Sequence, residues 1–173
     1  MNILSRFRSV KAFAFDMDGV LTDGSVLVNS ENNWPRTMNV RDGYALQLAV
    51  KSGFAVTVIS GSYSSYVHDR LQMLGVKDVF MNVKNKESLL EKYINDQGIS
   101  LDETLFMGDD IPDYGCLKMV GLSTCPADAA FEIIEKASYI SPFAGGKGCV
   151  RDVIEKVLKL NNKWSLQNNI VST

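Results

Sequence analysis

Short apolar runs that end in polar residues or glycine recur along the chain, and segments with apolar residues at helical spacing lie between them. Apolar runs of this length, bounded by turn residues, are typical of strands buried in a parallel sheet. The runs that predict strands are 11–15, 55–59, 79–81, 104–107, 121–124 and 138–140. The segments that predict helices are 44–50, 63–74, 85–97, 112–120 and a last one with its apolar stripe at Val150, Val153, Ile154, Val157 and Leu158. This alternation predicts an α/β fold, a Rossmann-like parallel sheet with helices on both faces.

Two regions depart from that alternation. Residues 25–28 and 36–40 read as two short strands around a polar turn at 30–33, which predicts a small β-hairpin excursion from the sheet. Beyond Trp164 the chain turns polar, so we expect 165–173 to form a loose tail. No repeat, linker or composition shift divides the sequence, and 1–173 is predicted to be a single domain.

Composition and charge exclude several classes of function. A formal net charge of −2 and a pI near 5.4 give no reason to expect nucleic acid as a partner. No apolar stretch approaches the roughly 18–20 residues that span a bilayer, and residues 1–11 lead into no signal-peptide core. Cys116, Cys125 and Cys149 are odd in number and lack metal-ligand spacing. We therefore expect reduced thiols in a cytoplasmic protein without membrane partners.

Carboxylates gather where the first predicted strand ends, in the string Asp16-Met17-Asp18-Gly19. Open α/β sheets bind ligands at the carboxyl ends of their strands. In an extended strand Asp16 and Asp18 would share one face, and two like charges that close are unfavourable unless a cation lies between them or one of them holds a proton. Carboxylate oxygens suit Mg²⁺, so the sequence predicts a magnesium site here.

The string from Asp16 to Gly24 resembles the first motif of the haloacid dehalogenase superfamily of phosphotransferases. The resemblance implies that Asp16 attacks phosphorus to form an aspartyl-phosphate. It also implies that Asp18 is the general acid/base and offers its backbone carbonyl to Mg²⁺. A metal makes this chemistry reasonable, because it can align a weak carboxylate nucleophile with an electrophilic phosphorus.

Three further stretches match the superfamily, each at a predicted strand end or helix start. Ser60, before Gly61, resembles the second motif, whose hydroxyl binds phosphoryl oxygens. Lys86 fits the third motif, and the family pattern favours it over the nearby Lys84. The segment 108–113 resembles the fourth motif. The fourth motif makes Asp109 a metal ligand, so the implied metal set is Asp16, Asp18 and Asp109. Asp110 and Asp113 would then orient metal-bound waters and Lys86.

Relatives with cap domains carry long insertions after the first or the second motif. Here the intervals from Asp18 to Ser60 and from Ser60 to Lys86 hold only the predicted hairpin, short helices and one strand. The sequence therefore predicts a capless member whose active-site mouth is open in a monomer.

A closer resemblance covers nearly the whole chain. Segments 37–44, 74–76 and 145–151 look like the 3-deoxy-D-manno-octulosonate 8-phosphate phosphatase family. That family uses Mg²⁺, its product feeds lipopolysaccharide synthesis, and it forms homotetramers in which a segment like Gly145–Gly148 reaches toward an active site. The substrate contacts implied by the resemblance are Asp18, Asn39, Val40, Arg41, Asp42, Gly43, Gln47, Ser60, Gly61, Arg70 and Lys86. Arg41 and Arg70 suit a sugar-acid carboxylate, because guanidinium binds carboxylate bidentately.

One departure from the family pattern concerns the substrate. The family usually carries an arginine just after the second motif, whereas this chain has Ser62 and Tyr63, and Lys147 stands where arginine is usual. This leaves phosphatases of other sugar-acid phosphates, such as 2-keto-3-deoxynononate 9-phosphate, as an alternative. Two non-enzymatic alternatives are a phospho-acceptor of the two-component receiver type and a regulatory homologue. A carboxylate at Asp18 argues against the receiver alternative, because an acid/base there speeds turnover rather than storing phosphate.

Overall fold

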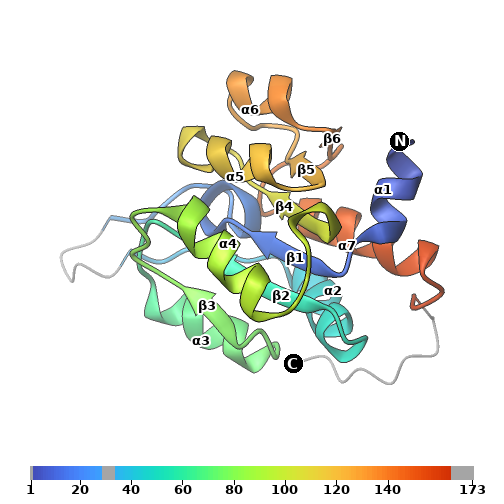
Figure 1. The fold of residues 1–173 in the computed structure, drawn as a ribbon. Helices are drawn as coiled ribbons and strands as arrows, with labels where there is room; N and C mark the ends of the chain where they lie inside the picture. Colours follow the sequence, from blue (N-terminus) through green and yellow to red (C-terminus); the bar gives the residue numbers. More distant parts are fainter. Residues whose placement is uncertain (1, 29–33, 165–173) are drawn as a thin grey trace.

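The fold is built around one parallel sheet, and the strand that precedes Asp16 is one of its two central strands (Figure 1). It is described by a computed structural model that covers residues 2–28 and 34–164. Within these residues the sheet has six strands in the order β3-β2-β1-β4-β5-β6, and every neighbouring pair is parallel. The strands are β1 (Ala12–Phe15), β2 (Ala55–Ile59), β3 (Asp78–Phe80), β4 (Thr104–Met107), β5 (Leu122–Cys125) and β6 (Tyr139–Ile140).

The strand order reverses direction at β1, which is the point where open α/β sheets form their binding crevice. The chain moves outward from β1 to β2 and β3, then returns to place β4 on the other side of β1. Phe15 pairs with Val58 on one side and Met107 on the other, so the residues that follow all three strands meet at one edge. This topology positions the site.

Helices cover both faces of the sheet (Figure 1). One face packs against α1 (Ile3–Ser9), α2 (Val40–Lys51), α3 (Ser65–Met73) and α7 (Cys149–Leu160). The other packs against α4 (Lys86–Asp96), α5 (Tyr114–Met119) and α6 (Phe131–Lys136). Short helical turns lie at η1 (Met17–Leu21), η2 (Leu101–Glu103) and η3 (Ile111–Asp113). Because β1 side chains alternate, Phe13 and Phe15 enter the first core and Ala12 and Ala14 the second.

The two helices nearest the site begin at asparagine caps. Asn39 Oδ1 accepts the amide of Arg41 at 2.8 Å, and Asn85 Oδ1 accepts the amide of Ser88 at 2.9 Å. Such caps satisfy amides that have no partner inside the helix. The cap at Asn85 therefore fixes Lys86 as the first residue of α4.

The predicted fold class is confirmed: an α/β Rossmann-like sheet covered by helices, with no cap domain in the part of the chain that the structure describes. Each predicted strand is present within one residue at either end, and the predicted helices are shifted by a few residues. Two short helices, α1 and α6, were not predicted. Each buries a single large side chain, Phe7 or Ile133, which is too little periodicity to recognise in a sequence.

The predicted β-hairpin is not formed by regular strands in the described residues. Segments 25–28 and 34–39 have irregular backbone, and Val40 already belongs to α2. One backbone hydrogen bond joins the two segments, from Leu27 N to Pro35 O at 3.3 Å. Proline at 35 removes a donor from such a ladder, which explains why pairing stops there. The predicted turn at 30–33 and tail at 165–173 lie outside the described residues.

Among the helices of the described residues, none combines the length and the apolar character needed to cross a membrane.

Candidate active site

Asp16 lies directly beyond β1, at the reversal of strand order. Its backbone amide still bonds to Met107 O at 2.9 Å, which ties it to the end of β4. The chain then turns sharply through η1, where Gly19 has φ +88°. A Cβ at Gly19 would stand 2.0 Å from Asp109 Oδ2, so glycine leaves room for the Asp109 carboxylate and also suits the positive φ.

Lys86 reaches from the start of α4 into the carboxylates. Its Nζ donates to Asp16 Oδ1 at 2.6 Å and to Asp113 Oδ1 at 2.7 Å, and the side chain is 8% exposed. Burial lowers the pKa of Lys86, but attraction to Asp16 and Asp113 outweighs it and raises the pKa above its usual value. The structure thus places Lys86, and not the exposed Lys84, against the predicted nucleophile.

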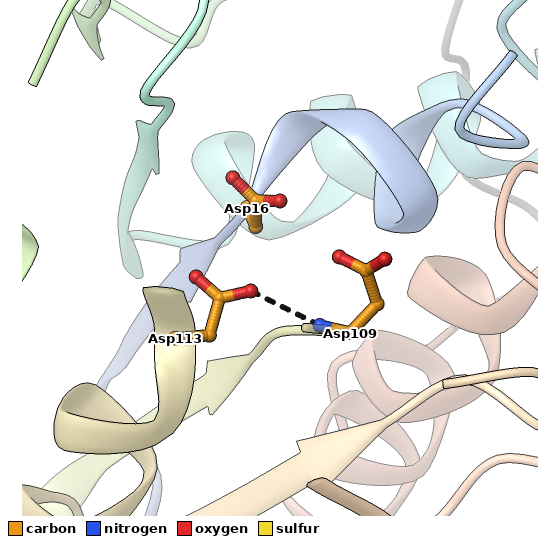
Figure 2. Close-up of side chains that lie close together, drawn as sticks. All are labelled: Asp16, Asp109 and Asp113. Atoms are coloured by element: carbon orange, nitrogen blue, oxygen red, sulfur yellow. Dashed lines mark hydrogen bonds between the residues drawn. The ribbon is translucent and has the colours of Figure 1, made fainter. Parts of the chain in front are cut away.

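Asp109 completes a cluster of three carboxylates, drawn in Figure 2. Asp16, Asp109 and Asp113 each offer an oxygen within 4.8 Å of the others. Asp113 Oδ2 accepts the Asp109 amide at 3.0 Å, the dashed line in Figure 2, while its other oxygen holds Lys86. Asp113 therefore orients both Lys86 and the backbone of Asp109. The exposed Asp110 instead caps η3, where its Oδ1 accepts the Ile111 amide at 2.8 Å.

The charges of this cluster do not balance. With all three ionised, the carboxylates of Asp16, Asp109 and Asp113 share one ammonium, that of Lys86, which leaves two negative charges. Burial and the neighbouring carboxylates raise the pKa values of Asp16 and Asp109 above their ordinary range. A divalent cation would supply the missing charge, and carboxylate oxygens are the ligands that Mg²⁺ prefers. The donor set therefore fits magnesium, with Asp16 and Asp109 as carboxylate ligands.

The Asp18 carboxylate belongs to a second network, separate from that of Lys86. Arg36 Nε donates to Asp18 Oδ1 at 2.8 Å and Arg36 Nη2 to Oδ2 at 3.0 Å. The hydroxyl of Ser62 donates to Oδ2 at 2.6 Å, and that of Thr22 to Oδ1 at 3.2 Å. Burial raises the pKa of Asp18, but these donors outweigh it and hold the pKa below its ordinary value.

A hollow of about 310 Å³ joins the two networks. The buried Ser60 follows β2 and accepts the Ser62 amide on its Oγ at 3.1 Å. The hollow is lined by Asp16, Asp18, Gly24, Ser60, Gly61, Ser62, Lys86, Asp109, Asp110, Pro112 and Asp113. The residues predicted from the four motifs therefore line one hollow. Its volume can hold a phosphoryl group and part of the molecule that carries it.

Comparison with known proteins agrees with this geometry. Residues 76–153 match the family described as haloacid dehalogenase-like hydrolase. The 3-deoxy-D-manno-octulosonate 8-phosphate phosphatase KdsC of Escherichia coli K12 is 30% identical over 162 residues, 94% of this chain and 86% of that protein. The chain belongs to the haloacid dehalogenase-like hydrolases.

Two solved structures resemble this hydrolase over nearly its whole length. The 3-deoxy-D-manno-octulosonate 8-phosphate phosphatase of Yersinia pestis has a TM-score of 0.90 at 27% identity, covering 93% of this chain and 87% of its own. The corresponding enzyme of Moraxella catarrhalis, in complex with magnesium ion, phosphate ion and a KDO molecule, has a TM-score of 0.89 at 31% identity. That match covers 93% of both chains.

The glycine-rich segment of this hydrolase packs on its own η1 turn. Gly146 N donates to Val20 O at 2.9 Å, and Asn39 Nδ2 donates to Gly146 O at 3.4 Å. A Cβ at Gly145 would lie 1.9 Å from Gly19 O, so the two backbones are in direct contact. The segment therefore supports the turn that carries Asp18 within the same chain.

The remaining predicted substrate contacts do not line the hollow around Asp16. Asn39 caps α2, Val40 is exposed, and Gly43 packs close to the Leu74 side chain. The other four occupy different surroundings: Arg41 lines a recess against α7, Asp42 and Gln47 are buried, and Arg70 lines a hollow with Arg36 and Tyr66. Their contacts with substrate stay predictions, and Asp42 and Gln47 are buried in the unliganded chain.

Asp42 links α2 to α7, and its burial leads us to predict that the folding stability of the protein depends on pH. It is 1% exposed, its Oδ1 accepts the Arg151 amide at 2.7 Å, and its Oδ2 has no hydrogen-bond partner among the described residues. Burial raises its pKa from 3.8 to about 6. The folded protein therefore binds more protons than the unfolded chain between these pH values, and folding stability falls as pH rises through that window.

Asp42→Asn keeps the acceptor for Arg151 and removes the buried charge. We expect the free energy of unfolding of the variant, relative to wild type, to increase by about 2–3 kcal/mol between pH 4 and pH 7. Urea unfolding of both proteins at several pH values measures this difference. The contributions of the other titrating groups are the same in the two proteins and cancel in the difference. Asp96→Asn makes the same substitution at an exposed position of α4, where no charge is buried, and is the matched control. A flat difference for Asp42→Asn would contradict the buried-charge account.

Sequence reasoning missed Arg36 and Ser62, both of which contact Asp18. The sequence has no arginine directly after Gly61, where the family usually carries one. The fold nevertheless places the guanidinium of Arg36 near this position, 3.3 Å from Ser62 Oγ. A clue was present, because Arg36 is the only cationic residue between Lys11 and Arg41 in the sequence. Nothing local tied it to a carboxylate 18 residues away.

Proposed function

We propose that this chain is a magnesium-dependent phosphatase that hydrolyses 3-deoxy-D-manno-octulosonate 8-phosphate to the free sugar acid and phosphate through an aspartyl-phosphate. The observation that carries the proposal is the meeting of Asp16, Lys86 and Asp109 at the reversal of strand order. Membership of a phosphoric monoester hydrolase family supports the reaction class. The similarity to named phosphatases across almost the whole chain supports the substrate.

Asp16 is the proposed nucleophile. Lys86 donates to Asp16 Oδ1 at 2.6 Å and so holds the carboxylate in the hollow. The new bond forms between an Asp16 carboxylate oxygen and phosphorus while the bond from phosphorus to the sugar oxygen breaks. Lys86 and the Ser60 hydroxyl, both on the same hollow, are placed to bind the phosphoryl oxygens where negative charge develops.

Asp18 is the proposed acid/base. In its protonated form it gives a proton to the leaving sugar alkoxide, which requires the pKa that Arg36, Ser62 and Thr22 lower to rise when substrate binds. The resulting carboxylate then takes a proton from the water that attacks phosphorus and breaks its bond to Asp16. Its carboxylate lies on the same hollow as Asp16 but is held by other donors, so the two acidic groups can perform separate tasks. Magnesium bound by Asp16, Asp109 and the Asp18 carbonyl would supply positive charge against the phosphoryl oxygens.

The proposal includes a homotetramer in the cytoplasm. Apolar side chains on the segments beside the site are exposed in one chain, including Leu27, Val28, Trp34 and Val40. Exposed apolar groups of this kind are typical of surfaces covered by another subunit. The three cysteines are free and buried, as expected of a protein from a reducing compartment. Light scattering on the purified protein tests the tetramer, and an active monomer would refute it.

A substrate screen tests the function. Purified protein is assayed for phosphate release from 3-deoxy-D-manno-octulosonate 8-phosphate, 2-keto-3-deoxynononate 9-phosphate and para-nitrophenyl phosphate, with MgCl₂ or with EDTA. We expect the eight-carbon substrate to give the highest kcat/KM and EDTA to abolish turnover.

Each other outcome has a defined meaning. Preference for the nine-carbon substrate would reassign the sugar acid, which the Ser62-Tyr63 sequence leaves open. Stable phosphorylation without turnover would favour a phospho-acceptor. No reaction with any of the three substrates would exclude the phosphatase.

A further inference from the structure

Four hydrogen-bond donors surround the Asp18 carboxylate, two on each oxygen. Oδ1 accepts from Arg36 Nε at 2.8 Å and from the Thr22 hydroxyl at 3.2 Å. Oδ2 accepts from Arg36 Nη2 at 3.0 Å and from the Ser62 hydroxyl at 2.6 Å. An ionised carboxylate has about four lone-pair sites, so these donors fill its capacity. Held in this way, the Asp18 side chain has no lone pair to offer to a cation.

Arg36 supplies two of the four donors and is itself fixed in place. Its side chain is only 4% exposed, and Nη1 donates to Trp34 O at 2.8 Å. A planar guanidinium that binds both oxygens sets the position and the plane of the carboxylate. Ser62 is part of the same arrangement, because Arg36 Nη2 also lies 3.3 Å from its hydroxyl oxygen. We name Arg36 and Ser62 the Asp18 clamp.

The clamp keeps the Asp18 carboxylate apart from the cation site. Asp18 lines the same hollow as Asp16 and Asp109. Its carboxylate nevertheless lies outside the cluster of three, drawn in Figure 2, whose oxygens come within 4.8 Å of one another. Within that cluster Asp113 is occupied as well, by Lys86 and the Asp109 amide. The carboxylates left for a metal ion are those of Asp16 and Asp109.

The number of available carboxylates affects the choice between divalent cations. Mg²⁺ needs a nearly ideal octahedron, and it is usually bound through one or two carboxylates while it keeps several waters. Ca²⁺ is larger, takes roughly six to eight oxygen ligands, and accepts carboxylates in mono- or bidentate form. Two carboxylates, one backbone carbonyl and water therefore suit Mg²⁺, whereas a third carboxylate would favour Ca²⁺.

We propose that the Asp18 clamp sets the selectivity of the metal site, because it withholds the Asp18 carboxylate from the cation and leaves the Asp18 backbone carbonyl as the ligand. Arg36 is thus a positioning residue that acts through Asp18. Without the clamp, the Asp18 side chain is free to turn toward Asp16 and Asp109 across the hollow that all three line. The inference rests on the magnesium site of the proposed phosphatase and is independent of the substrate and of proton transfer.

Cation affinities measured without substrate test this inference. The dissociation constants of Mg²⁺ and Ca²⁺ are obtained from the rise in unfolding temperature with cation concentration, for wild type, Arg36→Met and Ser62→Ala. We expect the Kd for Ca²⁺ divided by the Kd for Mg²⁺ to fall about tenfold in Arg36→Met and about threefold in Ser62→Ala. The lost charge of Arg36 would by itself tighten both divalent cations about equally and leave this ratio unchanged.

Two further variants show whether the effect runs through Asp18. In the double variant Arg36→Met with Asp18→Asn, no third carboxylate is released, so the ratio should equal that of Asp18→Asn alone. Arg8→Gln removes an arginine from the exposed surface of α1 and should keep the wild-type ratio. Ser62→Ala changes no charge, and it decides the test by itself if Arg36→Met does not fold.

The outcomes separate the clamp from the rest of the proposal. An unchanged ratio in the clamp variants, or a fall in the ratio that persists in the double variant, would overturn the inference. Wild type that is stabilised by neither cation would refute the metal site on which the inference stands. The phosphatase function is judged by a separate measurement, the release of phosphate by wild type, whose absence would leave the cation ratios to be read by themselves.

Discussion

Asp16→Asn is expected to lower kcat by a factor on the order of 10³ or more, with the fold intact. The amide lacks the charge and the lone-pair reactivity of a carboxylate, so no bond to phosphorus forms. In the wild-type protein Lys86 Nζ lies 2.6 Å from Asp16 Oδ1, and the oxygen of the asparagine amide can still accept this hydrogen bond. The substitution also removes one buried negative charge from the cluster. The measurement is phosphate release in excess MgCl₂, with thermal unfolding as the check on folding.

The matched control is Asp69→Asn, which makes the same change on the exposed surface of α3. It should leave both kcat and the unfolding temperature unchanged. Acid-quenched wild type should also carry phosphate on the peptide that contains Asp16, and the variant should not. Substantial turnover by Asp16→Asn, after deamidation has been excluded by mass spectrometry, would assign the nucleophile elsewhere.

Lys86→Met is expected to cost both stability and activity. Methionine has nearly the length of lysine but no charge, so Asp16 and Asp113 lose the ammonium that lies 2.6 and 2.7 Å from them. Leaving buried carboxylates without their cation destabilises a protein by roughly 3–5 kcal/mol. We expect a loss in kcat of about 100-fold or more, because the phosphoryl oxygens lose the same positive charge.

Magnesium gives this prediction a second readout. If three carboxylates without Lys86 bind a divalent cation more strongly, MgCl₂ should raise the unfolding temperature of Lys86→Met more than that of wild type. Lys84→Met, two residues earlier and exposed, removes the same charge from the surface and is the matched control. Equal behaviour of the two variants would contradict the role assigned to Lys86.

The local pattern of the sequence was enough to locate the elements that carry the chemistry. A strand buried on both faces is mostly apolar and carries no charge in its interior, so charged or polar residues that follow the run mark its end, as at Asp16, Ser60 and Asp109. Asn85 before Lys86 marks the start of a helix for an equally local reason. Once the sheet is known to be parallel, these ends must share one edge, and the hollow follows.

Segments without such periodicity were predicted less well. The hairpin prediction relied on alternation between 25 and 40, and the described parts of that region are irregular. Its importance lies in Arg36, whose place against Asp18 depends on how an irregular segment folds back over the site. The helices α1 and α6 are too short for their apolar spacing to stand out.

The sequence by itself determined the parallel α/β fold, the four strand-end and helix-start motifs, and the family to which the chain belongs. Only the tertiary structure decided that Arg36 and Ser62 hold Asp18, that Asp42 is enclosed against α7, and that Gly145 touches Gly19. The physical reason is the range of the interactions. Strands and helices can be predicted from the spacing of apolar residues that are close in the sequence. These contacts instead join residues that are 18 to 126 positions apart and that meet only when the core packs.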